Sequence, residues 1–552
     1  RRLLSHPLTL FHGNAFYPNG ESLAYTELLL PPSLLGLPGF LWGDPILTYN
    51  LLLLTLWPLN GLAMAWVAHG VTGSRPAAGL AAAVFCLSPY FTEYYLEFQM
   101  LLAALVPIVL YCWMRWLETG GRRWLAGALA GLAGQGLTTW YYAVILGLAL
   151  ATLTVAVLCL RWRGWRWRHR LVELLVGGVG VAGVLLPFAL PYLAVHWEFG
   201  YERGLAETSN HYADVFSFVE AGTRSRLYRH LPFSLTGHIP ETSAFVGAVV
   251  LALAGGAVWL SRDPARGAAR RVDRLILVLL ALSLALAGIA AAAGGLRWRW
   301  GPWRVSVRPG SAFDAAVLFG LAHLAVRGFL ADRARGPRTL TATDWVRCLL
   351  FVCGVSGLLA LGPEIHVGQR GVGPGPYLGL YHLFLPLHVV RTTIRFAVVT
   401  VAGLALLGAL GLRALEERLA PWPRWRWTLV AAVFAGVALE YAVVRGQYER
   451  VSADPRPVDL ALRRDPDEIA VLEWPTNVAA TDADAMVRSL VHGKLVVNGL
   501  SGVAPPLIPE LSKLLTTPAS PFPGADARAA LRRIYPLRYL VVRLDDPAVT
   551  PE

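Results

Sequence analysis

Lysine is nearly absent from this chain, and charge of either sign is scarce. Lysine occurs only at Lys494 and Lys513, and charged residues make up 15% of the 552 residues, against 55% that are hydrophobic. The mean hydropathy of +0.49 is too high for a water-soluble protein of several domains. The net charge of +13 comes almost entirely from arginines in short clusters between apolar runs. Such clusters are topology signals of a membrane protein, so we expect no nucleic-acid partner.

Cysteine and the familiar catalytic motifs are equally scarce. The five cysteines all stand inside apolar runs without CxxC spacing, which favours buried thiols over disulfides or metal ligands. The sequence has no P-loop, no Gly-rich nucleotide fingerprint and no HExxH. ATP-driven work and zinc-dependent hydrolysis therefore have no support. No cofactor is indicated by a motif, and a divalent cation is the one candidate that we retain.

Long apolar runs are what the chain does have. A run of about 20 apolar residues is long enough to span a bilayer as a helix. The sequence therefore predicts an α-helical, polytopic transmembrane bundle of about twelve helices. The runs cover residues 45–69, 77–89, 98–116, 124–139, 141–160, 171–195, 244–261, 274–293, 311–330, 345–362, 395–412 and 427–444.

Arginine clusters occupy every second connection between these runs. By the positive-inside rule those connections are cytoplasmic, which puts segment 1–44 and the tail from 445 outside. An outward first segment requires a further membrane span ahead of Arg1, and we expect that span to be missing from this sequence. One basic connection, residues 297–308, falls on the outer side by alternation. It indicates either a miscounted helix nearby or an amphipathic outer hairpin.

The tail has a different character from the rest of the chain. Residues 468–475, 494–502 and 537–546 read as strands, and 483–492 and 525–534 as helices. The sequence thus predicts three parts: a first extracytoplasmic loop, a transmembrane domain and an extracytoplasmic soluble α/β domain. Their predicted boundaries are residues 1–44, 45–444 and 445–552.

Two carboxylates in the first loop are candidate catalytic groups. Glu21 follows a turn at Pro18, and Glu27 stands just before an apolar stretch, where the chain reaches the membrane surface. A carboxylate held beside apolar walls can act as a general base with a raised pKa. Glu27 is the better placed of the two. A solvated loop with no catalytic role is an equally simple interpretation of this segment.

Other candidate residues stand at the predicted outer ends of helices. Glu93 and Glu97 are four residues apart and share a face if that turn is helical. Arg391 and Arg395 have the same spacing and suit a lipid phosphate, although arginines at this depth also serve as interface anchors. The proposed substrate-binding residues are Glu93, Glu97, Gln99, Tyr141, Arg391 and Arg395.

Several stretches together resemble a known superfamily. They are FYPNGESLAYTE, GDPILTYNLLLLTLWPLNG, LTTWYYAV, RTTIRFAVVTVAG, LEWP and VNGLSG, in that order. They resemble large bacterial membrane proteins placed with the GT-C glycosyltransferases, which include protein O-mannosyltransferases and aminoarabinose transferases. The resemblance implies a polyprenyl-phosphate sugar donor and an acidic residue in the first outer loop that acts as base or metal ligand.

The function indicated is transfer of a sugar from a lipid-linked donor to an extracytoplasmic glycan, lipid or protein acceptor. The protein would be a multi-pass protein of the inner (plasma) membrane, in contact with membrane lipid. A transporter or flippase of a lipid-linked saccharide is the alternative. Its usual signs are inverted repeats and ionisable residues in mid-helix, and the sequence shows no repeat. A structural scaffold that displays the tail would need no carboxylates.

Overall fold

The computed structural model divides the chain into two compact units, which we describe separately. The small unit comprises Arg1–Leu28, Leu186–Glu202 and Gly446–Glu552, and the helical unit comprises Leu29–Leu185 and Arg203–Arg445. The residues described are 7–95, 97–161, 167–200, 204–208, 212–222, 224–230, 242–260, 268–292, 296–300, 303–307, 315–316, 318–326, 340–444, 454–502, 504–516 and 522–543.

Six helices in the described part of the chain are long and apolar enough to cross a membrane. They are Pro45–Thr72 (α4), Phe98–Thr119 (α7 and α8), Trp140–Leu160 (in α10), Arg168–Phe199 (in α11), Ala342–Ala360 (α16) and Thr393–Arg418 (η7 and α18). The predicted total of about twelve spans is not confirmed. Several predicted runs form shorter helices, such as α5 (Arg75–Leu87), α9 (Arg122–Gly136) and α13 (Ala248–Leu260).

The first long helix, α4, begins at a capped residue. Asp44 is the N-cap of α4, and its Oδ1 accepts hydrogen bonds from the backbone N–H groups of Ile46 (2.8 Å) and Leu47 (3.3 Å). The helix ends at Gly73, whose φ of 65° lies in the left-handed region that glycine tolerates. Asp44 is therefore accounted for by its capping role.

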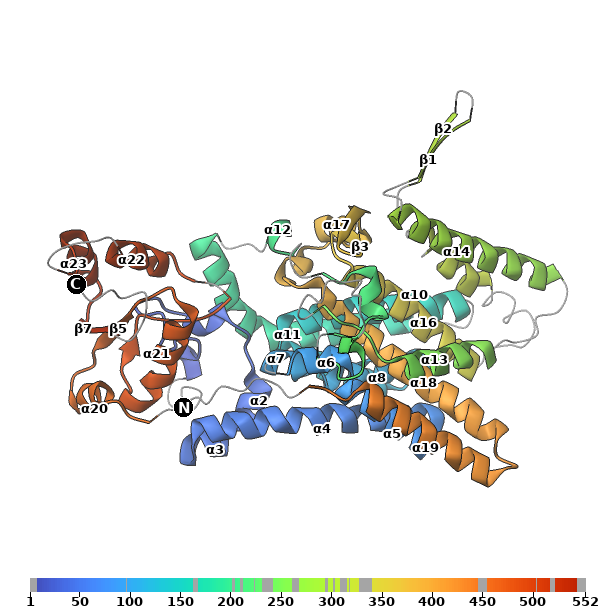
Figure 1. The fold of residues 1–552 in the computed structure, drawn as a ribbon, viewed down its shortest axis with the longest axis horizontal. Coiled ribbons are helices and arrows are strands. Elements are labelled where there is room, and N and C mark those ends of the chain that lie inside the picture. Colours follow the sequence, from blue (N-terminus) through green and yellow to red (C-terminus); the bar gives the residue numbers. More distant parts are fainter. Residues whose placement is uncertain are drawn as a thin grey trace. The chain divides into compact units, whose positions relative to one another are not determined.

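Helix α18 (Ala397–Arg418) forms the centre of the helical unit. It packs against α5, α13 and α16, and α5 also packs against α4 (Figure 1). Glycine makes the contact with α13 possible, because a Cβ atom at Gly411 would lie 2.0 Å from the carbonyl oxygen of Leu253. Small residues at helix contacts let the backbones approach closely, as is common between membrane helices.

The connections of the helical unit carry short helices and two hairpins. Within the stretch 297–308, for which the sequence left two interpretations open, the strands β1 (Leu296–Trp300) and β2 (Trp303–Val307) pair antiparallel. A second hairpin pairs β3 (Glu364–Val367) with β4 (Arg370–Pro374). The other elements are α2 (Leu30–Leu35), α3 (Leu37–Trp42), α6 (Pro89–Glu93), α7 (Phe98–Leu101), α8 (Leu105–Thr119), α10 (Trp140–Arg161), α11 (Trp167–Phe199), α12 (Leu205–Thr208), η4 (Val215–Phe218), η5 (Tyr228–His230), α14 (Ala268–Ala292), α17 (Pro376–Leu383), η6 (Leu385–Val389), η7 (Thr393–Phe396) and α19 (Pro423–Glu440).

The small unit is built on a parallel sheet with the strand order β6-β5-β7. These strands lie where the sequence predicts strands: β5 is Ala470–Trp474, β6 is Leu495–Val496 and β7 is Leu537–Val542. The predicted helices are also present, as α21 (Ala479–His492) and α23 (Ala525–Arg532). Two further helices, α20 (Pro457–Arg464) and α22 (Leu507–Thr516), were not predicted.

The beginning of the described chain belongs to the small unit. The backbone N–H of Val496 in β6 donates to the carbonyl oxygen of Asn14 (2.7 Å), and the N–H of Tyr17 donates back to the carbonyl of Val496 (3.0 Å). Phe16 and Tyr25 are buried in the same apolar cluster as Trp474 and Val496. The segment around 14–17 therefore extends the sheet beyond β6, whereas the sequence grouped residues 1–44 as one loop.

Candidate functional site

The clearest departure from regular helix in a long apolar span lies between α7 and α8. Helix α7 ends at Leu101 and α8 begins at Leu105, so the carbonyl groups near the break lack intrahelical partners. Side chains from three other helices supply the hydrogen bonds: Asn60 donates to Leu101 O (2.8 Å), Gln135 to Leu102 O (3.1 Å) and Tyr142 to Met100 O (3.0 Å). Interrupted helices occur in membrane proteins where such partners satisfy the backbone.

A buried arginine lies close to this break. Arg395 in η7, just before α18, is only 9% exposed, and its guanidinium carbon lies 4.1 Å from the centre of the Tyr141 ring. Tyr141 reaches the break too, because its hydroxyl contacts the sulfur of Met100 at 3.4 Å. A cation above an aromatic face is attracted electrostatically, and the attraction grows when water is excluded.

Four tyrosines surround this region, and all are buried. Tyr141 and Tyr142 pack edge to face with ring centres 5.0 Å apart, and Tyr90 and Tyr94 do so at 5.5 Å. Arg395 acts electrostatically on the hydroxyl groups of both Tyr90 and Tyr142. The charge of Arg395 therefore reaches one hydroxyl of each tyrosine pair, Tyr90 of α6 and Tyr142 of α10.

A carboxylate and an amide complete the group. Glu97, the N-cap residue of α7, lies near enough to Tyr142 for its negative charge to oppose the effect of Arg395 on the Tyr142 hydroxyl. The side-chain amide of Gln99 lies 3.5 Å from Glu97 Oε2. We call this set the Arg395 cluster, and it consists of Tyr90, Tyr94, Glu97, Gln99, Tyr141, Tyr142 and Arg395. Four of the predicted substrate-binding residues, Glu97, Gln99, Tyr141 and Arg395, belong to it.

Glu93 does not share a helix face with Glu97, as the four-residue spacing suggested. Helix α6 ends at Glu93 and α7 begins after Glu97, so the intervening turn is not helical. Glu93 Oε1 instead accepts from the backbone N–H of Arg224 (3.5 Å), and a Cβ atom on Gly222 would lie 2.0 Å from it. The Arg224 guanidinium lies 3.5 Å from the centre of the Tyr95 ring. Glu93 therefore holds the loop at 222–224.

Arg391 and Arg395 do not share a helix face either. Residues 391 and 392 lie outside any helix, and the 3-10 turn that carries Arg395 begins at Thr393. Arg395 is buried whereas Arg391 is half-buried. The prediction that Arg391 and Arg395 lie on one helix face is therefore wrong, because Arg391 is not part of a helix.

The two predicted catalytic carboxylates lie in the small unit. Glu21 has a left-handed φ of 54°, and its Oε1 lies 3.5 Å from His12 Nε2. Burial, together with Glu198 and Glu21, raises the pKa of Tyr25 to about 12. Glu27 is half-buried. Within the described residues, no group of three His, Cys, Asp or Glu side chains could hold a metal ion.

Sequence reasoning missed an ion network in the small unit. Arg456 lies 2.9 Å from Asp459 and 2.8 Å from Glu473, both of which are buried, and Arg543 lies 3.4 Å from Glu473. Burial alone would raise the pKa of Asp459, but its hydrogen bonds with Arg456 outweigh burial and hold that pKa below its ordinary value. No sequence signal points to this network, because its members are scattered over 87 positions of chain between Arg456 and Arg543.

Comparison with known proteins adds no identity to these observations. No protein-family model matches the chain, and no curated protein matches it.

Proposed function

We propose that this protein is a membrane glycosyltransferase that moves a sugar from a polyprenyl-phosphate-linked donor to an extracytoplasmic acceptor. The Arg395 cluster is the proposed donor site. In this proposal the protein is a multi-pass protein of the plasma membrane, with about twelve spans and with its small unit on the outer side. The resemblance of the sequence to the GT-C superfamily supports the reaction class.

The observation that carries the proposal is the burial of Arg395 beside tyrosine rings at the end of an apolar bundle. A charged side chain at such a position is costly and is typically functional. A guanidinium binds phosphate with two parallel hydrogen bonds, which a lysine cannot imitate.

The chemistry assigned to the cluster is a single displacement. A carboxylate takes the proton of the acceptor hydroxyl, and the acceptor oxygen forms a bond to the anomeric carbon of the donor sugar. The bond between that carbon and the phosphate oxygen breaks, and its electron pair stays on the oxygen. Polyprenyl phosphate leaves with one more negative charge than the donor carried, and Arg395 stabilises that charge. A bound divalent cation would serve the same purpose.

Glu97 is the carboxylate of the cluster that can serve as the base. It lies at the start of α7, next to Gln99, and acts on the same tyrosine as Arg395. The sequence-based assignment of the base to Glu27, with Glu21 as the lesser candidate, stays a prediction. The two assignments differ in a way that one pair of substitutions separates.

The test is transfer of labelled sugar from polyprenyl-phosphate sugars by membranes that contain the full chain. We expect Glu97→Gln to lower transfer by ~100-fold or more, the scale for loss of a general base, at unchanged protein abundance. Glu510→Gln, at an exposed site of α22, is the control and should keep full activity. If Glu27→Gln abolishes transfer and Glu97→Gln does not, the base is Glu27.

Full transfer in both variants would overturn the assignment of a carboxylate base. A wild-type protein that binds the donor and moves it across the membrane, but releases no polyprenyl phosphate, would contradict the enzyme and support the transporter.

A further inference from the structure

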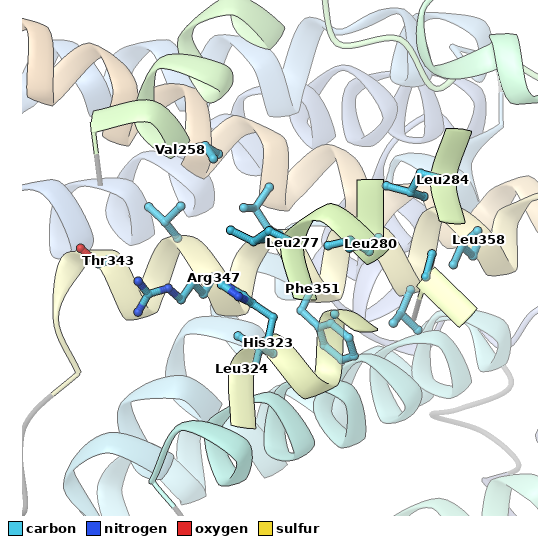
Figure 2. A pocket seen from close by; sticks show the side chains of 16 residues that line it. Val258, Leu277, Leu280, Leu284, His323, Leu324, Thr343, Arg347, Phe351 and Leu358 are labelled. Atoms are coloured by element: carbon cyan, nitrogen blue, oxygen red, sulfur yellow. The ribbon is translucent and has the colours of Figure 1, made fainter. Parts of the chain in front are cut away.

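A cavity of about 460 Å³ lies within the helical unit, away from the Arg395 cluster. It is open on one side and lined by residues of α13, α14, α16 and the helical residues 318–326 (Figure 2). Its volume falls within the range typical of sites for small ligands. Almost all of its lining is aliphatic or aromatic, and the polar exceptions are His323, Thr343 and Arg347.

The cavity is a groove that follows one face of α16. The α16 residues that line it begin at Thr343, end at Leu358 and recur at spacings of three and four residues, the pattern of a single helix face. At 1.5 Å per residue this face is about 22 Å long. One leaflet of a bilayer contributes about 15 Å of hydrocarbon, half of the full core. The groove is therefore long enough for one acyl chain and the start of its headgroup.

The polar residues of the groove gather at one end. Figure 2 shows Thr343 and Arg347 toward one end and Leu284 and Leu358 toward the other. Arg347 is mostly buried, with 14% of its side chain exposed, and it pairs with Asp344 at 3.2 Å. Asp344 does not line the groove, and no other carboxylate does. The groove wall thus presents a cation at this end.

The start of α16 already carries a carboxylate. Asp344, in the first turn, accepts hydrogen bonds from the backbone N–H (3.0 Å) and the hydroxyl (2.8 Å) of Thr341, so its charge meets the positive end of the helix dipole. The connection 327–347 that leads into this turn is rich in arginine, and the positive-inside rule predicts it to be cytoplasmic.

The middle of the groove is open. A Cβ atom added at Gly354 would meet no atom within 4 Å. Gly354 lines the groove between Arg347, the charged residue of the groove, and Leu358, the last α16 residue that lines it. A larger side chain at this position would therefore project into the groove without striking the backbone.

We propose that this groove binds a membrane phospholipid with an anionic headgroup. One acyl chain lies along α16, and the phosphate lies at Arg347, near the inner surface of the membrane. An apolar slot of this length fits a hydrocarbon chain, and the single cation at its end complements a negative headgroup. The site is separate from the proposed donor site and does not depend on the proposed function.

Lipid binding can be counted directly by native mass spectrometry on the full, delipidated chain in detergent. We expect the chain to bind one added molecule of dioleoyl phosphatidylglycerol with at least ~10-fold preference over dioleoyl phosphatidylcholine, whose cationic choline cancels the charge of its phosphate. Gly354→Phe should abolish this binding by filling the groove. Gly255→Phe, at an open and exposed glycine on α13 outside the groove, should leave it unchanged.

A second variant tests the headgroup independently of the acyl chain. Arg347→Gln should remove the preference for phosphatidylglycerol while both lipids still bind. Equal binding of the two lipids to the wild-type protein would overturn the anionic headgroup. Full phosphatidylglycerol binding by Gly354→Phe would overturn the site, and so would loss of preference in Gly255→Phe.

Discussion

Two buried carboxylates of the small unit, Asp459 and Glu473, pair with arginines, whereas two buried carboxylates of the helical unit accept hydrogen bonds from neutral groups. In the small unit Arg456 lies between Asp459 and Glu473. In the helical unit the buried Glu416 accepts a hydrogen bond from the hydroxyl of Ser74 (2.5 Å), and Arg395 lies over a tyrosine ring. This difference indicates that the stability of the small unit depends on ion pairs between separate segments of its chain.

Buried Glu440 follows the pattern of the helical unit. Its Oε1 accepts from the hydroxyl of Tyr228 (2.6 Å) and from the backbone N–H of Ala248 (2.8 Å), so that it caps the start of α13 from the end of α19. Burial, followed by the hydrogen bond to Glu440, raises the pKa of Tyr228. A carboxylate at a helix N-terminus is favoured by the exposed backbone N–H groups and the helix dipole.

The ion network of the small unit provides the largest expected effect. Arg456→Ala leaves Asp459 and Glu473 buried with part of their positive charge removed, which costs about 3–5 kcal/mol for a buried pair. We expect a corresponding rise in hydrogen exchange of β5, measured on the full chain. Arg538→Ala is the control, because Arg538 is 49% exposed and pairs with Asp465 and Asp467 at the surface. Its loss should leave the exchange of β5 close to that of the wild-type protein, because an exposed ion pair adds little stability. Equal exchange in the two variants would contradict the contrast.

Backbone packing of the helical unit provides a smaller effect. Gly411→Ala places a methyl group against the Leu253 carbonyl, a backbone atom that cannot turn aside, and overpacking of this kind costs about 1–3 kcal/mol. We expect a lower melting temperature of the detergent-solubilised protein. Size-exclusion chromatography after heating measures it, as the loss of the peak of folded protein. Gly147→Ala, in α10, meets no atom within 4 Å and should not lower the melting temperature.

The pH dependence of the small unit provides the smallest expected effect. Burial lowers the pKa of His492 below its ordinary value of 6.5. The unfolded chain therefore binds a proton before the folded one does, so the stability that neutral His492 contributes is present above pH 6.5 and is lost as pH falls below it. Hydrogen exchange of α21, corrected for intrinsic rates, should rise in this window. The rise should disappear in His492→Gln, and its persistence there would assign it to another group.

Local sequence signals predicted much of the regular structure. The strands of the small unit rest on neighbouring residues and are present in the fold, and of the two interpretations left open for residues 297–308 the paired strands β1 and β2 fit the hairpin. The apolar runs predicted helices, but run length did not separate long spans from shorter helices such as α9.

The candidate site depends on contacts that no local pattern shows. The break between α7 and α8 lies within the apolar sequence LLAAL and is stabilised by Asn60, Gln135 and Tyr142, which are 41, 33 and 42 positions away from their acceptors. Helical spacing likewise failed for Glu93 and Glu97 because the chain turns between them. Residue type pointed to Arg395 and Tyr141, and only the fold brings them together.

Binding of polyprenyl phosphate to the purified full chain is the sharpest test of the proposed donor site, because it measures the role of Arg395 without the acceptor. We predict that Arg395→Gln weakens this binding by ~10-fold or more, the scale of one charge-assisted contact, and that Arg395→Lys restores only part of it because lysine lacks the two-pronged geometry. Arg391→Gln should do less, since Arg391 lies outside the cluster. Wild-type affinity in a folded Arg395→Gln variant would contradict the account.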